Sequence, residues 1–216
     1  MHRMSLSPDR VRRLYDRLGA WYDWAERYES SAKARAFERL ELVAGQRLLD
    51  VGAGTGLDHA RLQAAVSPGG TAIAVDISRV MLQLVRQRTG APVCAADAHQ
   101  LPFRDARFDR LFCAYVLDLI PEADLPGVLA EFYRVLNPGG RLALVTLTDG
   151  VTVASRLFVG LWKGAYAVSP IVCGGCRPVP LASALETAGF SRLIRDVEVQ
   201  LTVSSQVVTA SRPDLD

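Results

Sequence analysis

Apolar and polar positions change their period along the chain, and these changes divide it into three stretches. Between residues 46 and 150, short apolar runs alternate with segments whose apolar residues recur every three or four positions. This alternation predicts strands and amphipathic helices in turn. The expected strands are 47–51, 71–75, 92–95, 109–116 and 141–148, and the expected helices are 57–65, 78–88 and 125–136. Strands that are apolar along nearly their whole length predict a mostly parallel sheet with helices on both faces.

The pattern after residue 150 differs from this regular alternation. A long apolar segment, 151–172, and a shorter one, 180–188, have helical spacing, and two strand-like runs follow at 193–201 and 205–210. The link between these two runs is too short for a parallel crossover, so we expect an antiparallel hairpin. The whole chain is therefore expected to be one α/β domain with a doubly wound, Rossmann-like sheet of seven strands.

The first 45 residues have helical patterns. Ser7 and Pro8 are a favourable N-cap and first helical residue, and apolar residues then recur at helical spacing from Val11 to Tyr28. A second helix is expected over 31–43, before a glycine. Because both helices precede the first strand, we expect them to form a helical cap.

Composition places the chain among globular proteins. Half of the 216 residues are hydrophobic, 22% are charged and the formal net charge is +2, so charge gives no reason to expect a nucleic-acid partner. The basic start is not followed by the apolar core of a secretion signal, and no uncharged apolar run reaches the roughly 20 residues that span a bilayer. Four cysteines are too few for a disulfide scaffold, which favours a cytoplasmic protein.

A glycine-rich segment follows the first strand. Residues 48–56 read Leu-Leu-Asp-Val-Gly-Ala-Gly-Thr-Gly, so Gly52, Gly54 and Gly56 stand at alternate positions between a strand and a helix. Glycine permits a sharp turn and lets a ligand approach the backbone closely, and the helix offers free N–H groups. In an open α/β sheet this turn is a usual ligand site. The alternative is a plain strand–helix turn.

Three aspartates, Asp50, Asp76 and Asp97, end or follow the first three strands. Asp76 lies about 20 residues beyond the last glycine, where a carboxylate accepts hydrogen bonds from ribose hydroxyls. A dinucleotide enzyme would carry G-x-G-x-x-G; here the spacing is G-x-G-x-G, and Asp50 would repel a diphosphate but not the ammonium of a methionine group. The pattern therefore favours S-adenosylmethionine, with Asp97 accepting a hydrogen bond from the adenine amine. A solvated strand end for Asp76 and a helix N-cap for Asp97 are the alternatives.

Two further segments complete a family pattern. Together with 101–109 and with Asn-Pro-Gly-Gly at 137–140, the glycine segment and its aspartates resemble class I methyltransferases of the ubiquinone/menaquinone-biosynthesis type, over roughly residues 10–150. The resemblance implies an enzyme that transfers a methyl group from S-adenosylmethionine. The parts it implies are a helical cap or lid over 1–45, a cofactor-binding core over 46–150, and an acceptor-side lid with the terminal strands over 151–216.

The expected cofactor-binding residues come mainly from these segments. They are Tyr22, Asp50, Gly52, Ala53, Gly54, Thr55, Gly56, Asp76, Ile77, Met81, Asp97, Ala98 and Ala114. Tyr22 belongs to a tyrosine–aspartate pair that the related enzymes carry in a lid, where an aromatic face would attract the cationic sulfonium. The alternatives are a place in the apolar stripe of its helix for Tyr22 and a place in the core for Met81.

Candidate catalytic residues are few, because methyl transfer from a sulfonium is an in-line displacement in which alignment of the nucleophile is the main task. A general base is needed only where the acceptor keeps a proton. The candidates are Tyr115 and Asp118, after the fourth strand, and His99, on the preceding loop. Asp118 could instead cap a helix, and His99 could be a solvated loop residue.

An apolar stripe over 157–166, flanked by Arg156 and Lys163, lies where the acceptor is commonly covered in this fold. It predicts a small, lipophilic acceptor, such as a quinol, a phospholipid head group or a phenolic metabolite, unless the stripe is ordinary core. With the arginines and aromatic residues of 10–24, it could also dock the chain reversibly on an anionic bilayer as a peripheral protein.

A C-x-x-C pair, Cys173 and Cys176, stands in a glycine turn. Zinc needs about four ligands, and the sequence offers neither a second cysteine pair nor a histidine cluster, so we expect no metal. Two thiolates would still suit a trivalent metalloid, which leaves an arsenite methyltransferase as an alternative. A dinucleotide-dependent oxidoreductase and a scaffold domain that binds the cofactor without turnover are two further hypotheses.

Overall fold

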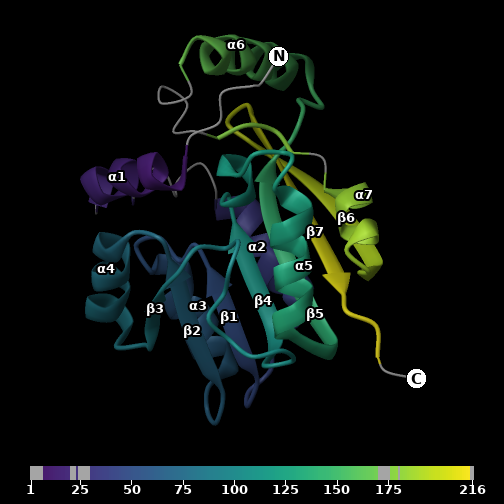
Figure 1. The fold of residues 1–216 in the computed structure, drawn as a ribbon. Coiled ribbons are helices and arrows are strands. Elements are labelled where there is room, and N and C mark those ends of the chain that lie inside the picture. Colours follow the sequence, from purple (N-terminus) through teal and green to yellow (C-terminus); the bar gives the residue numbers. More distant parts are fainter. Residues whose placement is uncertain (1–6, 20–22, 24–29, 170–175, 180, 215–216) are drawn as a thin grey trace.

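The computed structural model describes residues 7–19, 23, 30–169, 176–179 and 181–214. Figure 1 shows its helices: α1 (Pro8–Leu18), α2 (Ser30–Leu40), α3 (Leu57–Val66), α4 (Arg79–Thr89), the 3-10 helix η2 (Leu117–Leu119), α5 (Leu125–Val135), α6 (Val153–Val168) and α7 (Ala182–Thr187). The strands are β1 (Arg47–Val51), β2 (Thr71–Asp76), β3 (Val93–Ala95), β4 (Phe108–Ala114), β5 (Leu136–Leu147), β6 (Ser191–Gln200) and β7 (Val203–Ser211). None of the helices in these ranges is both long enough and apolar enough to cross a membrane.

The strands form one seven-stranded sheet in the order β3-β2-β1-β4-β5-β7-β6. The first five strands are parallel to their neighbours, whereas β7 runs antiparallel to both β5 and β6. The chain reverses its direction of winding between β1 and β4, which is the switch point where open α/β sheets bind ligands. The predicted doubly wound, mostly parallel sheet with an antiparallel hairpin at its end is confirmed.

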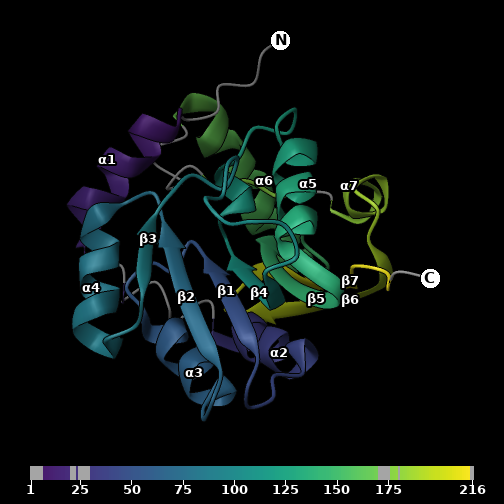
Figure 2. The ribbon, with the colours of Figure 1, turned by 60° about the horizontal axis from the view of Figure 1, so that its bottom comes forward.

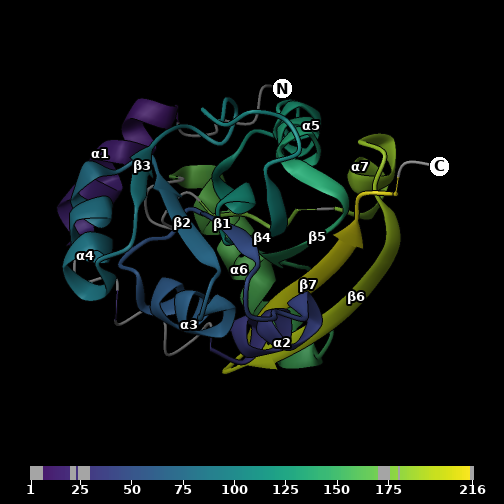
Figure 3. The same ribbon diagram turned by 90° about the horizontal axis from the view of Figure 1, so that it is seen from below.

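Helices cover both faces of the parallel part of the sheet. Figures 2 and 3 show α2, α3 and α4 on one face, and α5 and α7 on the other. Adjacent residues of β1 point to opposite faces: Leu48 belongs to the apolar cluster that contains Ala36 of α2, and Leu49 to the cluster that contains Leu129 of α5. Both leucines are fully buried, which explains why the strands are apolar along their whole length.

Charged pairs fasten α2 to the outermost strand. Arg39 Nε lies 2.8 Å from Asp196 Oδ2, and Arg35 Nε lies 3.4 Å from Glu198 Oε1, both on β6. The buried residues of α2 are Ala32, Lys33, Ala36 and Leu40. The second predicted helix, α2, thus packs on one face of the sheet. In contrast, α1 contacts α4 and lies at the carboxyl ends of the parallel strands (Figure 1).

Several boundaries differ from the sequence predictions. The first helix ends at Leu18 instead of continuing toward residue 28, because Gly19 has a φ of 49° and a ψ of −136°, which are not helical angles. Residues 20–22 and 24–29 lie outside the described residues. α6 ends at Val168, short of 172. Residues 137–140, which lie between the predicted helix 125–136 and the predicted strand 141–148, fall inside β5, where the pairing with β4 shifts register.

Candidate active site

A cavity of about 530 Å³ lies at the carboxyl ends of β1, β2 and β4. The turn after β1, the end of β2, the segments after β3 and β4, and α1 all contribute to its wall. The predicted site residues that line it are Asp50, Gly52, Ala53, Gly54, Thr55, Asp76, Ile77, Asp97, Ala98, His99, Ala114 and Tyr115. Segments far apart in the sequence therefore meet around one space beside the switch point.

The three glycines of the turn have different roles. All have positive φ, which favours glycine. A Cβ on Gly52 would lie 2.0 Å from Val116 Cγ2, so this position is closed by the segment after β4. A Cβ on Gly54 would meet no protein atom within 4 Å, and Gly54 lines the cavity. The backbone at Gly54 is therefore open to a ligand.

Asp76 joins the end of β2 to the glycine turn. Its carboxylate accepts hydrogen bonds from the backbone N–H of Gly54, at 3.0 Å, and from that of Ser78, at 2.8 Å. Burial raises the pKa of Asp76 to about 6, although these backbone donors lower it. A ligand whose hydroxyl groups donate hydrogen bonds to this carboxylate would offset part of the cost of its desolvation.

Buried charged groups form one end of the cavity. Lys33 Nζ of α2 lies 2.8 Å from Asp58 Oδ2 of α3, and Asp50 Oδ2 lies 2.9 Å from His59 Nδ1. Lys33, Asp50 and Asp58 all line the cavity. Burial raises the pKa of Asp50, and its contact with His59 opposes the rise. This end can therefore receive a zwitterion, with its ammonium at Asp50 and its carboxylate at Lys33.

Sequence reasoning missed Lys33, although a signal was available. A lysine at position 33 shares the helical stripe of Ala36 and Leu40, which are fully buried. A charged residue on the apolar face of an amphipathic helix needs a buried partner. The partner, Asp58, lies in a different helix, so the pairing could not be read from local spacing.

The segment after β3 carries a hydrogen-bonded acid and base. The backbone N–H of His99 donates to Asp97 Oδ1 at 3.0 Å, and the imidazole Nδ1 contacts the same oxygen. On the other side of the ring, Nε2 lies 3.8 Å from Asp124 Oδ2. All three residues line the cavity, so His99 is held between two carboxylates at its wall.

Tyr115 lines the cavity and is 6% exposed. Its hydroxyl is 2.8 Å from Ser205 Oγ of β7, and Lys33 Nζ lies 5.9 Å from its ring centroid. Its φ of 58° is unusual for a residue with a side chain. Such backbone strain is concentrated at functional sites, and here it turns the chain at the end of β4.

Three of the predicted site residues that the structure describes do not line the cavity. Asp118 is fully buried, and its carboxylate accepts a hydrogen bond from the Leu147 N–H, at 3.0 Å from Oδ2, which ties η2 to β5. Met81 is fully buried in α4, as the core alternative expected. Gly56 serves helix packing, because a Cβ there would lie 2.9 Å from Val85 Cα. Tyr22 lies outside the described residues.

An apolar part of the wall was also missed. β4, the segment after it and α1 supply this part, through Val11, Phe112, Val116, Leu119, Ile120 and Pro121. The sequence prediction for the segment after β4 named only Tyr115 and Asp118. The apolar run 116–121 directly follows the strand, and so many apolar residues are unfavourable in a loop exposed to water. This run was therefore a signal in the sequence for an apolar wall.

Of the C-x-x-C pair, only Cys176 lies within the described residues, and it does not line the cavity. Cys176 is a free cysteine whose carbonyl accepts the indole N–H of Trp162 at 3.0 Å, and Cys173 lies outside the described residues. Within the ranges that the structure describes, no three His, Cys, Asp or Glu side chains are grouped so that they could hold a metal ion.

The sequence matches known methyltransferases. A family model described as a methyltransferase domain matches residues 49–144. A demethylmenaquinone methyltransferase from Symbiobacterium thermophilum is 37% identical over 168 residues, which cover 71% of this chain and 65% of that protein. A malonyl-[acyl-carrier protein] O-methyltransferase from Laribacter hongkongensis is 32% identical over 222 residues, which cover 95% of this chain and 71% of that protein.

Solved structures share the fold. A methyltransferase of Haloferax volcanii, solved in complex with a methyltransferase activator, superposes with a TM-score of 0.76 at 19% identity, covering 95% of this chain and 99% of that one. A methyltransferase of Thermotoga maritima that depends on S-adenosylmethionine has a TM-score of 0.70, also at 19% identity. The sequence match over nearly the whole chain, with the glycine turn and aspartates around one cavity, shows that this chain belongs to the class I methyltransferases that depend on S-adenosylmethionine.

Proposed function

We propose that the chain methylates a small apolar acceptor, and that this acceptor is a reduced quinol ring. The observation that carries the proposal is a single cavity that combines the glycine turn and three aspartates with an apolar wall. S-adenosylmethionine, when bound, supplies an electrophilic methyl group on its sulfonium. Both reactants have a complementary surface in one space, which is what in-line transfer requires.

The residues around the turn fit the cofactor. We assign the ribose hydroxyls to Asp76, the adenine amine to Asp97, and the ammonium and carboxylate of the methionine part to Asp50 and Lys33. Gly54 leaves the approach to the backbone open. These four groups of the cofactor then each have a partner of opposite charge or complementary hydrogen-bonding character.

The acceptor side suits a ring with an acidic hydroxyl. An aromatic ring can pack against Val116, Leu119 and Ile120, which line the cavity. We assign His99 as the base that removes the hydroxyl proton and so makes the ring nucleophilic. Its contact with Asp97 would stabilise the imidazolium that forms. The demethylmenaquinone methyltransferase among the relatives supports an acceptor of this class.

The direct test is label transfer from methyl-labelled S-adenosylmethionine. The acceptors are a chemically reduced short-chain demethylmenaquinol, the same quinone left oxidised, and buffer alone. We expect label only in the reduced ring, and His99→Gln should lower its rate at least about 100-fold while S-adenosylhomocysteine still binds. Absence of label from the reduced ring, with active cofactor binding, would contradict a quinol acceptor.

A second candidate acceptor is a carboxylate presented by an acidic carrier protein. The Laribacter relative, a malonyl-[acyl-carrier protein] O-methyltransferase, matches 95% of this chain. On the structure, α1 borders the cavity and exposes Arg10, Arg12, Arg13 and Arg17. A malonyl thioester on acyl carrier protein is therefore added to the same assay as a further acceptor, and label in its methyl ester would favour this candidate.

We also propose that the chain takes a lipophilic acceptor from an anionic membrane surface. Of the nine exposed large apolar side chains among the described residues, five lie between 151 and 168. Leu157 and Leu161, one turn apart on α6, are 68% and 77% exposed. α6 and the basic α1 lie at the same end of the sheet as the cavity (Figure 1). Apolar and basic surface together suit weak, reversible docking.

A further inference from the structure

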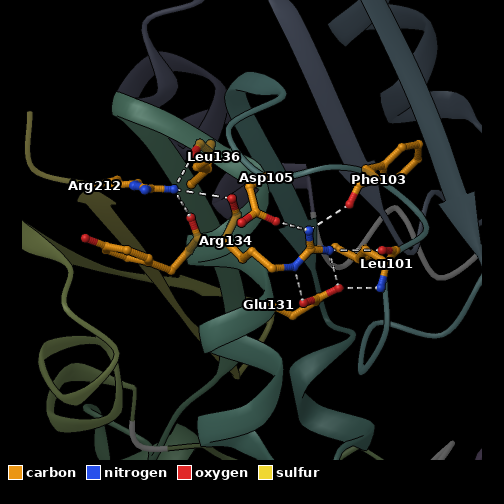
Figure 4. A network of polar contacts seen from close by, with 8 residues as sticks. Leu101, Phe103, Asp105, Glu131, Arg134, Leu136 and Arg212 are labelled. Carbon is orange, nitrogen blue, oxygen red and sulfur yellow. Dashed lines mark hydrogen bonds and ion pairs between the residues drawn. The ribbon is translucent and has the colours of Figure 1, made fainter. Parts of the chain in front are cut away.

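A network of polar contacts joins α5 to the loop that leads away from Asp97 and His99 (Figure 4). Arg134, in the last turn of α5, donates from Nη1 to the Phe103 carbonyl at 2.8 Å and from Nη2 to the Leu101 carbonyl at 3.1 Å. It also bonds Asp105 Oδ1 at 2.6 Å. One side chain thus holds three residues of the loop.

Glu131 bonds both Leu101 and Arg134. Its Oε1 accepts the Leu101 N–H at 2.7 Å, and both of its oxygens accept from Arg134, at 2.7 and 2.8 Å. The backbone donor and acceptor of Leu101 are therefore both bonded to this pair. Arg134 and Glu131 mutually favour their charged forms, which lowers the pKa of Glu131 and makes these hydrogen bonds charge-assisted.

The held loop is connected directly to the cavity wall. The Gln100 N–H donates to the Asp97 carbonyl at 3.0 Å, and the same two residues form an isolated β-bridge. Leu101 follows Gln100 and is almost fully buried. A shift of Leu101 would therefore move the tight turn that presents Asp97 and His99 to the cavity.

We propose that Arg134 and Glu131 are positioning residues that fix the adenine-binding turn at 97–100. The inference rests on the proposed function, because it takes Asp97 as the partner of the adenine amine. The pair touches no ligand itself. It sets the place of the Asp97 carboxylate relative to Asp76, and so the selectivity of the site for adenine.

Arg212 provides a matched control on the same end of α5. It donates to the carbonyls of Tyr133, Arg134 and Leu136, and its guanidinium lies 4.6 Å from the Tyr133 ring centroid. Figure 4 shows both arginines on this helix end, but among the described residues the side-chain bonds of Arg212 go to α5 and β5 and none goes to the 101–105 loop. Its loss should cost stability without moving the turn.

The test compares Arg134→Gln, Arg134→Lys, Glu131→Gln and Arg212→Gln with the wild type. Calorimetry gives the Kd for S-adenosylhomocysteine and for S-inosylhomocysteine, in which a carbonyl replaces the adenine amine, and thermal melting gives Tm. We expect Arg134→Gln and Glu131→Gln to weaken the binding of S-adenosylhomocysteine about tenfold and to bring the ratio of the two Kd values closer to one. Arg134→Lys, which retains the charge, should lie between Arg134→Gln and the wild type.

Arg212→Gln should lower Tm with both Kd values unchanged. Equal effects of Arg134→Gln and Arg212→Gln on binding, or an unchanged ratio in every Arg134 and Glu131 variant that folds, would overturn the positioning role. A wild-type chain that binds S-adenosylhomocysteine but not selectively would overturn the adenine assignment of Asp97 and the positioning role with it. A wild-type chain that does not bind it would overturn the proposed function.

Discussion

At the scale of single residues, two features separate a ligand site from an ordinary turn. Gly54 has positive φ and faces open space, whereas a Cβ on Gly52 or Gly56 would collide with neighbouring protein atoms. Asp76 is buried with backbone donors on its carboxylate and still has a raised pKa. Together they describe a polar recess built to accept hydroxyl groups that the protein does not itself supply.

Gly54→Ala should abolish measurable binding of S-adenosylhomocysteine and leave the chain folded, because the new Cβ would occupy the ligand's approach to the backbone. Gly45→Ala is the matched control: Gly45 also has positive φ, and a Cβ there would meet no atom within 4 Å, but Gly45 does not line the cavity. Each change should cost about 1 kcal/mol of backbone strain. Equal Kd values for the two variants by calorimetry would remove Gly54 from the site.

Asp76 should make binding depend on pH. The ligand donates hydrogen bonds to the ionised carboxylate, whose pKa in the unliganded chain is about 6, so binding below pH 6 must expel a proton. The Kd for S-adenosylhomocysteine should be constant above about pH 7 and rise up to tenfold per pH unit below 6. Asp76→Asn should weaken binding by about 1.5–3 kcal/mol at high pH and flatten the profile. A wild-type profile as flat as that of the variant would contradict the ribose assignment.

At the scale of elements, α2 shows how the sheet positions a charge. Ion pairs to β6 and a buried alanine stripe hold the helix on the sheet, and Lys33 reaches Asp58 and the cavity from it. The side chain is only 7% exposed, so its charge depends on this pairing. The ionic end of the site thus depends on the packing of a helix that precedes the first strand.

Lys33→Met should lower the free energy of unfolding by about 3 kcal/mol, because it removes the buried partner of Asp58 and leaves that carboxylate only the longer contact with the exposed Arg61, at 3.8 Å. Adding Asp58→Leu should restore most of this stability, since the unpaired charge is removed. Binding of S-adenosylhomocysteine should stay weak in both variants if Lys33 receives the cofactor carboxylate. Denaturant unfolding and calorimetry measure the two effects separately, and full recovery of binding in the double variant would contradict the assignment.

Much of the fold was predictable, because both sheet faces are covered and the strands are therefore uniformly apolar. The place of the glycine turn and Asp76 at the cavity was also predictable, because it follows from their spacing after β1 and at the end of β2. Asp118 and Met81 do not line the cavity, and local sequence does not reveal that one carboxylate bonds Leu147 and that the methionine is buried. The contribution of Lys33 depends on contacts between separate elements, which spacing along the chain does not encode.

At the scale of the whole molecule, α6 and α1 lie at the end of the sheet where the parallel strands have their carboxyl ends (Figure 1), which is also the end where the cavity lies. α6 carries exposed apolar residues and α1 carries exposed arginines. The antiparallel hairpin of β6 and β7 forms one edge of the sheet, and β3 forms the other. A reactant that arrives at the carboxyl ends of the strands would therefore meet apolar and cationic surface before the cavity. This arrangement suits an acceptor that partitions into anionic lipid.

Docking predicts that the chain co-sediments with anionic vesicles at low salt, less at high salt, and little with neutral vesicles. The paired change Leu157→Ser and Leu161→Ser should reduce co-sedimentation without altering the Kd for S-adenosylhomocysteine, because both side chains are exposed and neither lines the cavity. Val43→Ser, at another exposed apolar residue far along the chain from α6, is the control. Equal, negligible sedimentation in every condition would leave an acceptor taken from solution.

Calorimetric titration of the wild-type chain with S-adenosylhomocysteine and with NAD shows whether the cavity at the switch point is a site for S-adenosylmethionine. We expect one S-adenosylhomocysteine to bind per chain, with binding lost in Gly54→Ala and retained in Gly45→Ala, and no heat of binding with NAD. Binding of NAD in place of S-adenosylhomocysteine, or of neither ligand to a folded chain, would show that the cavity is not a site for this cofactor.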